Sequence, residues 1–266
     1  MKFADKSVIY LLCLIITVTI IAPVITGSDP LKIDLDSLKQ PPSIHHLFGT
    51  DTKGRDIFSR VLYGGRVSLG ISLLAAVFSM SIGFLVGLIA GYAGGRIDSI
   101  LTALIDLVLS FPSLLLAIGI SVVLPPGIYT VMIAIASVGW ASFARVIRGY
   151  ILTIREMPYV ESARAVGCSG TRILLFYLLP QCIPIGIVMM GLKLGGYIIT
   201  EASLGFLGLG QQPPAPSWGG MISAGRAYIL SEPWIVFFPG AAIVVTALCF
   251  NLLGDILRDS YGLRIK

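Results

Sequence analysis

Few side chains in this sequence are chemically reactive, and its two histidines are the first to consider, as metal ligands. His45 and His46 are adjacent. Neighbouring residues point in different directions on regular structure, so this pair does not predict a two-ligand site. The zinc pattern His-Glu-x-x-His and the phosphate-binding pattern G-x-x-x-x-G-K-[ST] do not occur in the sequence. We therefore expect neither a metal nor a cofactor bound by this chain, and no catalytic residue.

Ionisable residues in apolar stretches are the second candidates for chemistry. Asp106 and Lys193 stand within such stretches, and Glu201 ends one. Charge in hydrocarbon is costly, so such residues often mark hydrated pathways. The alternatives are a hydrogen-bonded packing role for Asp106 and, for the other two, side chains that reach the interface. Gly254-Asp255 lacks a second intramembrane aspartate motif, which leaves an intramembrane hydrolase only as a distant alternative.

The composition predicts a membrane protein. Hydrophobic residues make up 56% of the sequence and charged residues 12%, against roughly 25% charged in a soluble domain, and the mean hydropathy is +0.91. Apolar runs of about twenty residues are long enough to cross a bilayer as helices. We expect an all-α integral membrane protein with six transmembrane helices, at about 8–26, 67–93, 99–123, 129–152, 173–200 and 235–257.

These spans divide the chain. Residues 1–66 hold the first helix and an external segment, residues 67–260 form a core with a cytoplasmic helix at about 156–170, and residues 261–266 form a cytoplasmic tail. Lys2 and Lys6 precede the first span, which we expect to remain uncleaved. The excess of lysine and arginine places both termini in the cytoplasm. That anchoring explains the net charge of +5 and predicts no nucleic-acid partner.

Small residues and prolines predict how the spans pack. Gly83, Gly87, Gly91 and Gly95 recur at every fourth position, so they lie near one stripe of a helix and allow another helix to approach closely. Packing within the chain and a subunit interface would both use this stripe. Pro112 removes a backbone donor and should bend the third span.

A second external segment, at about 202–233, is rich in glycine, proline and large apolar residues, Trp218 among them. Tryptophan is favoured at membrane interfaces. We expect this segment to contact a soluble partner or to gate the outer mouth of a pathway, the alternative being a passive plug. Asp106, Glu201 and Trp218 are our candidate pathway or gate residues.

A polar, helix-prone stretch lies between two long apolar runs, at residues 156–172. Ala163 and Ala165 favour a helix and leave a small surface that a partner groove can approach. Glu161 near the start of the helix suits the positive end of its dipole. Gly167 and Gly170 would end the helix and return the chain to the membrane. The alternative is an ordinary loop helix.

This stretch resembles the E-A-A-x-x-x-G motif of ABC-importer permease subunits, through Glu161-Ser162-Ala163-x-x-x-Gly167 and the following Leu179-Pro180. Ser162 replaces the usual alanine and Tyr177 the usual isoleucine, and both departures are mild.

Further blocks resemble the dipeptide/oligopeptide/nickel permeases, above all their C-type subunit. They cover the chain from residue 48 to residue 259, and are Phe48-Gly-Thr-Asp51 with Gly54-Arg55-Asp56 and Ser59-Arg60, Glu201-Ala-Ser-Leu-Gly-Phe-Leu-Gly-Leu-Gly210 with Pro213-Pro214 and Pro216-Ser-Trp218-Gly219, and Asn251-Leu-Leu-Gly-Asp255-x-Leu-Arg258-Asp259.

The resemblance implies a type I ABC importer permease fold in a prokaryotic cytoplasmic (inner) membrane, surrounded by membrane lipid. The chain would form the pathway with a homologous permease subunit. Two ATP-binding subunits would use ATP-Mg below it, and an extracellular or periplasmic binding protein would deliver the substrate. The implied cargo is di- or oligopeptides, with nickel or metal chelates as the alternative. An ATP-independent transporter is a distant alternative.

The resemblance also implies how this machine would work. ATP-driven closure of the ATPase subunits would move docked helices, and rigid spans would convert that movement into alternating access. The residues that would couple the chain to an ATPase are Glu161, Ser162, Ala163, Ala165, Gly167, Leu179 and Pro180.

Overall fold

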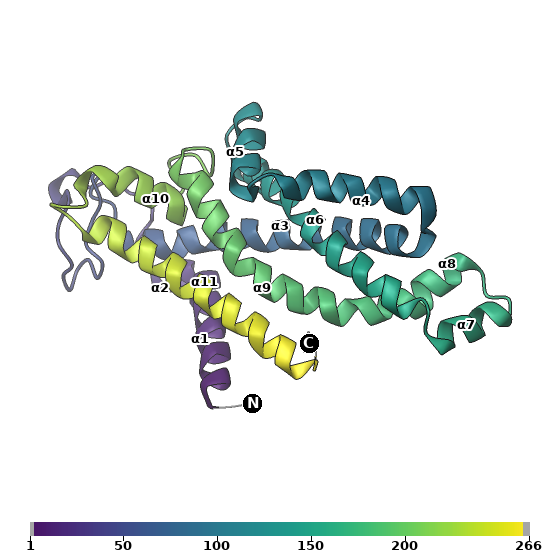
Figure 1. Ribbon diagram of the computed structural model, residues 1–266. Helices are drawn as coiled ribbons and strands as arrows, with labels where there is room; N and C mark the ends of the chain where they lie inside the picture. Colours follow the sequence, from purple (N-terminus) through teal and green to yellow (C-terminus); the bar gives the residue numbers. More distant parts are fainter. Residues whose placement is uncertain (1–2, 263–266) are drawn as a thin grey trace.

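The computed structural model of the chain describes residues 3–262. Its regular structure in that range is helical, apart from one isolated β-bridge between Thr50 and Asp56. The long helices α3 (Ile57–Ala93), α6 (Ile128–Ile154), α9 (Leu179–Phe206) and α11 (Trp234–Ser260) form an elongated bundle (Figure 1). The prediction of an all-α protein is therefore confirmed for the described part of the chain.

Within residues 3–262, four helices are each long and apolar enough to cross a membrane. They are α3, α6, α11 and the continuous run Gly170–Phe206, which joins α8 (Gly170–Ile173), a π-helical turn (Leu174–Leu178) and α9. The bent pair α4 (Gly95–Ser110) and α5 (Ser113–Val123) makes a fifth if it is one span. The first predicted span corresponds to α1 (Phe3–Ile20) and the short α2 (Ala22–Ile25), so the number of six spans stays a prediction.

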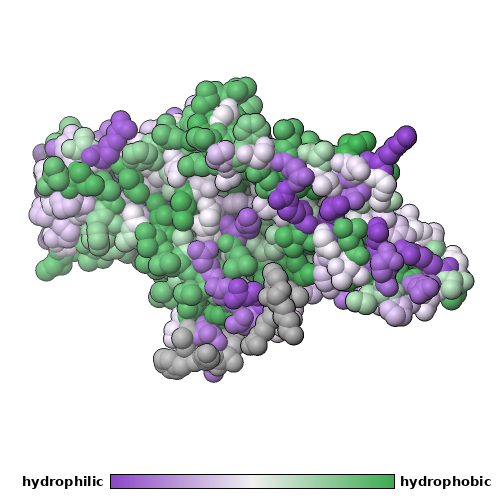
Figure 2. Space-filling view, viewed as in Figure 1, coloured by the Kyte–Doolittle hydropathy of each residue, from purple (hydrophilic) through white to green (hydrophobic). Residues whose placement is uncertain are grey.

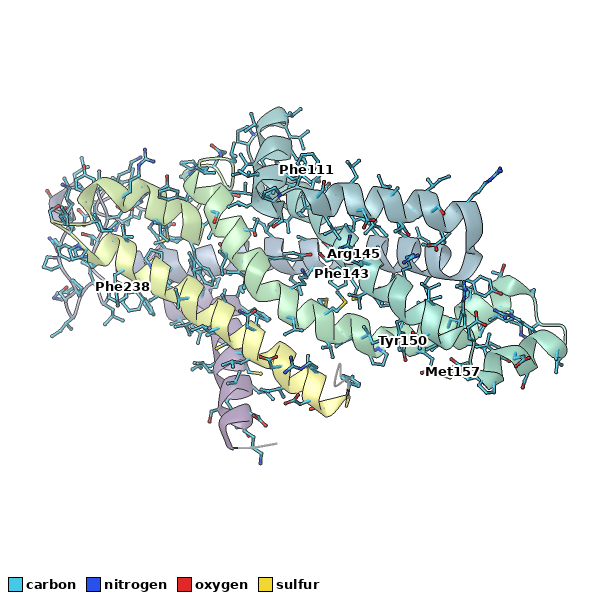
Figure 3. All side chains as sticks on the ribbon, in the orientation of Figure 1. Phe111, Phe143, Arg145, Tyr150, Met157 and Phe238 are labelled. Atoms are coloured by element: carbon cyan, nitrogen blue, oxygen red, sulfur yellow. The ribbon has the colours of Figure 1, made fainter. Side chains whose placement is uncertain are left out.

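The expected bend at Pro112 is present, but it divides the span into two helices. α4 and α5 meet at 90°, and Phe111 between them is extended, with φ −92° and ψ 144°. A residue that precedes proline avoids the helical conformation because the proline ring would clash with it. Figure 3 places Phe111 at this corner.

The second span begins ten residues earlier than the sequence predicts. Asp56 caps α3, and its Oδ2 accepts a hydrogen bond from the backbone N–H of Ser59 at 2.8 Å. Arg60 falls within the predicted external segment, but it lies in α3 and is only 6% exposed. Its guanidinium donates to the carbonyl oxygen of Pro30 at 2.9 Å and lies 3.5 Å from the Asp51 carboxylate, so its charge is compensated inside the fold.

α3 and α6 form the most extensive helix pair of the bundle. A Cβ at Gly83, Gly87 or Gly91 would come within 2.4–2.9 Å of α6 atoms, the Cβ of Phe143 and the Cβ of Ile147 among them. The predicted glycine stripe is therefore confirmed as packing within the chain at these three positions. Gly95 is not part of it, because it begins α4 and has no atom within 4 Å of a Cβ position.

The two ends of the bundle differ in character. At one end α10 (Trp218–Gly225) and the irregular segment 26–56 pack on α11, and the rings of Phe48 and Phe238 stack at 3.9 Å. α7 (Pro158–Ala165) and α8 form the other end (Figure 1). Figure 3 shows Phe238 toward the α10 end and Met157 toward the α7 end. Figure 2 shows hydrophilic residues gathered at the α7 end, with apolar residues over much of the surface between the ends.

The predicted division into residues 1–66, 67–260 and 261–266 stays a prediction. Its first boundary falls inside α3, and α11 ends at Ser260, where the predicted core ends. Residues 1–2, with Lys2, and residues 263–266 of the predicted tail lie outside the described residues.

Candidate functional site

One face of α7 is packed against the rest of the chain. Val160 is fully buried and Ala163 is 8% exposed, whereas Ala165 is exposed. Both buried residues belong to a cluster at the base of α6 and α9 that includes Ile147, Ile151, Ile173, Leu178 and Cys182. Ala163 therefore packs in the chain's own core, and the coupling role of Ala163 and Ala165 stays a prediction.

The end of α7 has the hydrogen bonds of a Schellman cap. The backbone N–H of Cys168 donates to the carbonyl oxygen of Ala163 at 3.0 Å, and the backbone N–H of Gly167 donates to the carbonyl oxygen of Arg164 at 2.9 Å. This arrangement needs a left-handed residue after the helix, and Gly167 has φ +86°. Glycine adopts such a φ without the steric penalty that a Cβ imposes. Gly167 ends α7 as the sequence predicts, whereas Gly170 does not end a helix but begins α8.

The opposite side of α7 is exposed. We call the exposed residues Glu161, Ser162, Ala165, Val166 and Gly167 the docking face. Val166 is 85% exposed, although it is apolar. The hydroxyl of Ser162 donates to the carbonyl oxygen of Pro158 at 2.9 Å, so the serine adds no unpaired polar group. The docking face is therefore small and open to a partner. It carries the carboxylate of Glu161, and the exposed Arg164 lies beside it.

A π-helical turn connects the α7 end to α9. The backbone N–H of Leu179 donates to the carbonyl oxygen of Leu174, five residues earlier. Pro180 has no N–H, and in a regular helix its ring would clash with the carbonyl four residues earlier. Such wider turns often occur where a helix must accommodate a local irregularity. Leu179 packs against the cluster that holds Val160, so α7 and α9 are joined by shared packing.

Arginines at the base of α6 join it to α3 and α4. Arg148 makes a bidentate ion pair with Asp98, with N–O distances of 2.5 and 2.7 Å. The guanidinium of Arg155 donates to the carbonyl oxygen of Gly91 at 2.9 Å. Bidentate arginine–carboxylate pairs fix geometry as well as charge. α7 therefore follows a helix that is tied to its neighbours.

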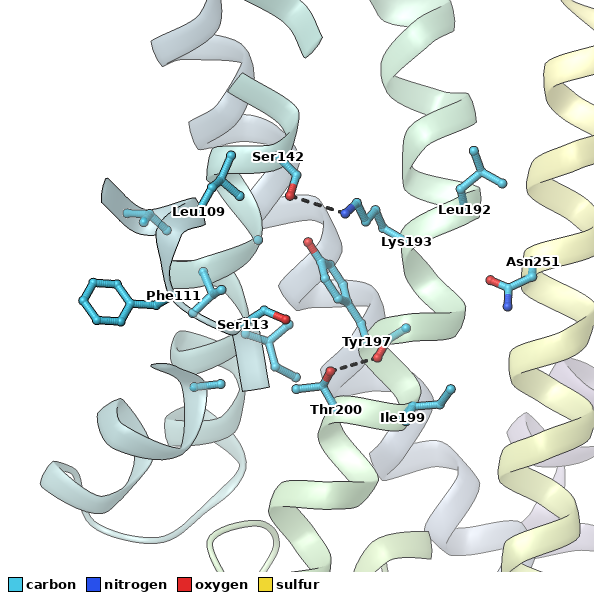
Figure 4. A pocket seen from close by; sticks show the side chains of 16 residues that line it. Leu109, Phe111, Ser113, Ser142, Leu192, Lys193, Tyr197, Ile199, Thr200 and Asn251 are labelled. Atoms are coloured by element: carbon cyan, nitrogen blue, oxygen red, sulfur yellow. Dashed lines mark hydrogen bonds between the residues drawn. The ribbon is translucent and has the colours of Figure 1, made fainter. Parts of the chain in front are cut away.

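A cavity of about 380 Å³ lies farther along the bundle, between the α4–α5 corner, α6, α9 and α11. Figure 4 shows Lys193 reaching from α9 toward α6, with Tyr197 and Thr200 below it. The ammonium Nζ of Lys193 donates to the hydroxyl of Ser142 at 3.3 Å. Asn251 of α11 completes the polar lining on the far side.

The three candidate pathway or gate residues do not meet at this cavity. Asp106 forms an ion pair with Arg145, both side chains being more than half exposed, and it is not a lining residue. Glu201 is fully buried and Trp218 is 2% exposed. The indole N–H of Trp218 donates to the carbonyl oxygen of Val61 at 2.9 Å and ties α10 to α3. Their roles in a pathway or gate stay predictions.

Sequence analysis missed the polar lining of the cavity. Lys193 was considered only by itself, as a residue that marks a hydrated pathway or has a side chain that reaches the interface. Lys193, Tyr197 and Thr200 follow one another at spacings of four and three, which puts them on one side of a helix. That spacing was the available signal. The contribution of Ser142 from α6 could not be read from it.

Comparison with known proteins agrees with this architecture. The family model described as "binding-protein-dependent transport system inner membrane component" matches residues 83–266. The dipeptide transport system permease protein of Alkalihalophilus pseudofirmus is 41% identical over 94% of this chain and 83% of its own length. A glutathione transport system permease protein of Escherichia coli O6:K15:H31 is 43% identical over 95% of this chain and 84% of its own length.

A solved structure shares the fold. A chain of the methionine ABC transporter MetNI, in an inward-facing conformation, matches with a TM-score of 0.60 and 19% identity, over 76% of this chain and 97% of that chain. Together with the apolar helices, the sequence relatives identify a non-enzymatic membrane subunit. The chain belongs to the family of binding-protein-dependent transport system inner membrane components, the permease subunits of ABC transporters.

Proposed function

We propose that this chain is one of two homologous permease subunits of an importer for di- or oligopeptides. Two ATP-binding subunits that use ATP-Mg would drive it, and an external binding protein would deliver the peptide. Both termini would lie in the cytoplasm. The relatives' names support the cargo, since dipeptide and glutathione transport recur among them.

The observation that carries the coupling role is the division of α7 into two sides. Val160 and Ala163 pack into the cluster shared with α9, whereas the docking face is open. A helix with one side anchored in this way can transmit an external push. The push would pass through the cluster into α9, which borders the cavity. Rigid packed elements carry such displacements because close-packed interiors do not deform continuously.

Reconstitution would test the proposal. The chain would be co-expressed with its neighbouring permease, ATPase and binding-protein genes, purified as a complex, and placed in liposomes. We expect accumulation of a labelled dipeptide that requires both ATP and the binding protein. A parallel arm with a labelled nickel chelate tests the metal alternative. Dipeptide accumulation without ATP, or accumulation of nickel alone, would contradict the proposal.

Site-specific crosslinking would test the docking role separately. A photoreactive residue at Ala165 should crosslink to the ATPase subunit. The same probe at Leu230, which is 97% exposed at the α10 end, should not. A crosslink to the ATPase from Leu230 rather than from Ala165 would reverse the proposed orientation.

A further inference from the structure

Lys193 holds a positive charge well inside an apolar span. It lies within the run Gly170–Phe206, far from either end. Its side chain does not run toward the end of the helix, because its Nζ crosses to α6 and donates to Ser142. Ionisable residues at such depth are expensive to bury and commonly mark substrate pathways.

The charge of Lys193 is not compensated by the chain. Among residues 3–262, no carboxylate lies within 4.0 Å of its Nζ. An ammonium group has three donors, and the single hydrogen bond from Lys193 goes to Ser142. The remaining donors lie at a cavity, where they can meet a ligand.

The cavity has a size and lining that suit a small peptide. Its volume of about 380 Å³ is within the range of roughly 300–1,000 Å³ that holds small molecules. Apolar residues such as Leu109, Val138 and Ile199 form much of the wall. The side-chain amide of Asn251 also borders it and makes no hydrogen bond within the described chain. The cavity therefore has a polar part, which includes Lys193, Tyr197 and Thr200, beside its apolar wall.

We propose that this cavity receives the peptide in transit and that Lys193 binds its terminal carboxylate. The inference rests on the proposed function. A main-chain carboxylate is common to peptides of every sequence, so the cation can hold any of them while the apolar wall tolerates different side chains. A single point charge binds weakly enough to release its ligand, which a transport pathway requires.

The test compares two peptides that differ only at the carboxyl end, Ala-Ala and its carboxamide, in liposomes containing the complete complex. Each is supplied at a concentration that saturates the binding protein, so any preference of that protein is the same for every permease variant. We expect Lys193→Met to lower the uptake of Ala-Ala by about ten- to a hundredfold, the usual effect of losing a charged hydrogen bond. Uptake of the carboxamide should stay at its wild-type level.

Two variants serve as controls. Lys193→Arg keeps the charge and should keep most of the Ala-Ala uptake. Lys32→Met removes one exposed charge outside the cavity and should change neither peptide. The elution volume of the complex should be the same in all variants, because Lys193 would act on the peptide and not on assembly.

The outcomes separate this inference from the proposed function. If wild type accumulates Ala-Ala but Lys193→Met loses both peptides equally, or loses neither, the inference is wrong and the proposed function stands. If Lys193→Arg lost as much Ala-Ala uptake as Lys193→Met, the role of Lys193 would be steric, and this would also overturn the inference. If wild type accumulates no peptide at all, the proposed function fails, and this inference fails with it.

Discussion

The backbone N–H of Cys168 donates a hydrogen bond to the carbonyl oxygen of Ala163 at 3.0 Å. This bond closes the end of α7 over Gly167, whose φ of +86° turns the chain back toward α8. Space around Gly167 is open, with no atom within 4 Å of a Cβ position. The backbone turn, and not crowding, therefore limits which residues fit there.

Gly167→Asp should uncouple the transporter without preventing its assembly. Aspartate tolerates the left-handed region better than most residues, so the turn should survive. Its negative charge would lie on the docking face and at the negative end of the helix dipole. We expect uptake to fall by about tenfold or more, which corresponds to about 1.4 kcal/mol of docking free energy, while the permease pair still co-purifies.

Gly167→Asn is the matched control, because asparagine has nearly the same shape and also tolerates this conformation. It should keep more uptake than Gly167→Asp. Normal uptake by a well-assembled Gly167→Asp complex would count against the coupling role.

Ala163 and Ala165 should respond differently to the same substitution. Ala163→Leu adds volume to the packed cluster around Val160, and overpacking typically costs about 1–3 kcal/mol. Ala165→Leu changes an exposed position, and such changes usually stay within about 0.5 kcal/mol. Thermal unfolding in detergent should therefore show a lower unfolding temperature for Ala163→Leu and an unchanged one for Ala165→Leu. ATP-driven uptake should fall in both variants, because Ala163→Leu disturbs the packed cluster and Ala165→Leu blocks the docking face. Equal unfolding temperatures for the two variants would refute this assignment of faces.

The contrast between these alanines shows where sequence information ends. The composition, the apolar runs and the spacing of glycines in α3 are local patterns. They predicted the helical class, most of the spans and a close approach of another helix to α3, but not that this helix is α6. An eight-residue helix such as α7 is too short for periodicity to define its buried face. That face is defined by Ile147, Ile151 and Ile173, which belong to other helices.

Long-range partners explain the other differences. Arg60 was assigned to the external segment before the second span, but it lies in α3, where Asp51 and the carbonyl of Pro30 compensate its charge inside the fold. For Lys193 the sequence left a hydrated pathway and a side chain that reaches the interface as alternatives, and its partner Ser142 lies 51 positions earlier in the sequence. No single-sequence pattern reports such pairings, and both concern charged groups, whose burial is costly unless they are paired.

Gly87→Ala should disrupt the α3–α6 pair. The added Cβ would lie 2.8 Å from the carbonyl oxygen of Ala144 and 2.9 Å from the Cβ of Ile147, so the helices must separate. We expect a loss of about 1–3 kcal/mol in the free energy of unfolding. Gly70→Ala is the control on the same helix, because no atom lies within 4 Å of its Cβ position. There alanine should be neutral or stabilising. Equal losses of unfolding free energy in Gly87→Ala and Gly70→Ala would show that the contact between α3 and α6 is not the cause.

The segment 202–233 should contact the external binding protein. Its tip is exposed and apolar, with Leu230 97% and Ile229 54% exposed. Photoreactive residues at Leu230 and Gln212 should crosslink to the binding protein, and more strongly when it carries peptide. Phe176, 73% exposed near α8, is the control and should not react. If no position scanned between residues 202 and 233 gave a crosslink, the segment would serve as a gate or plug without contacting the partner.

Glu201 should limit stability and support transport at the same time. Its carboxyl is fully buried, and neither oxygen has a hydrogen-bond partner among the described residues. The hydroxyl of Ser68 lies near it on α3 and accepts a bond from the backbone of Trp218 at 3.3 Å. An unsatisfied buried polar group costs about 1–3 kcal/mol. Glu201→Leu should therefore raise the free energy of unfolding by about that amount.

Uptake should nevertheless fall in Glu201→Leu. The carboxyl lies where α9 meets α3 and α10, and the contact between α9 and α10 must change if α10 gates the pathway. A gain in stability with a loss of activity is typical of residues kept for function. Glu201→Gln keeps the shape and the hydrogen-bonding capacity, so it separates a need for a polar group from a need for charge. If Glu201→Leu instead destabilised the protein, the carboxyl would be hydrogen-bonded to the hydroxyl of Ser68. Ser68→Ala should then cause the same loss of stability.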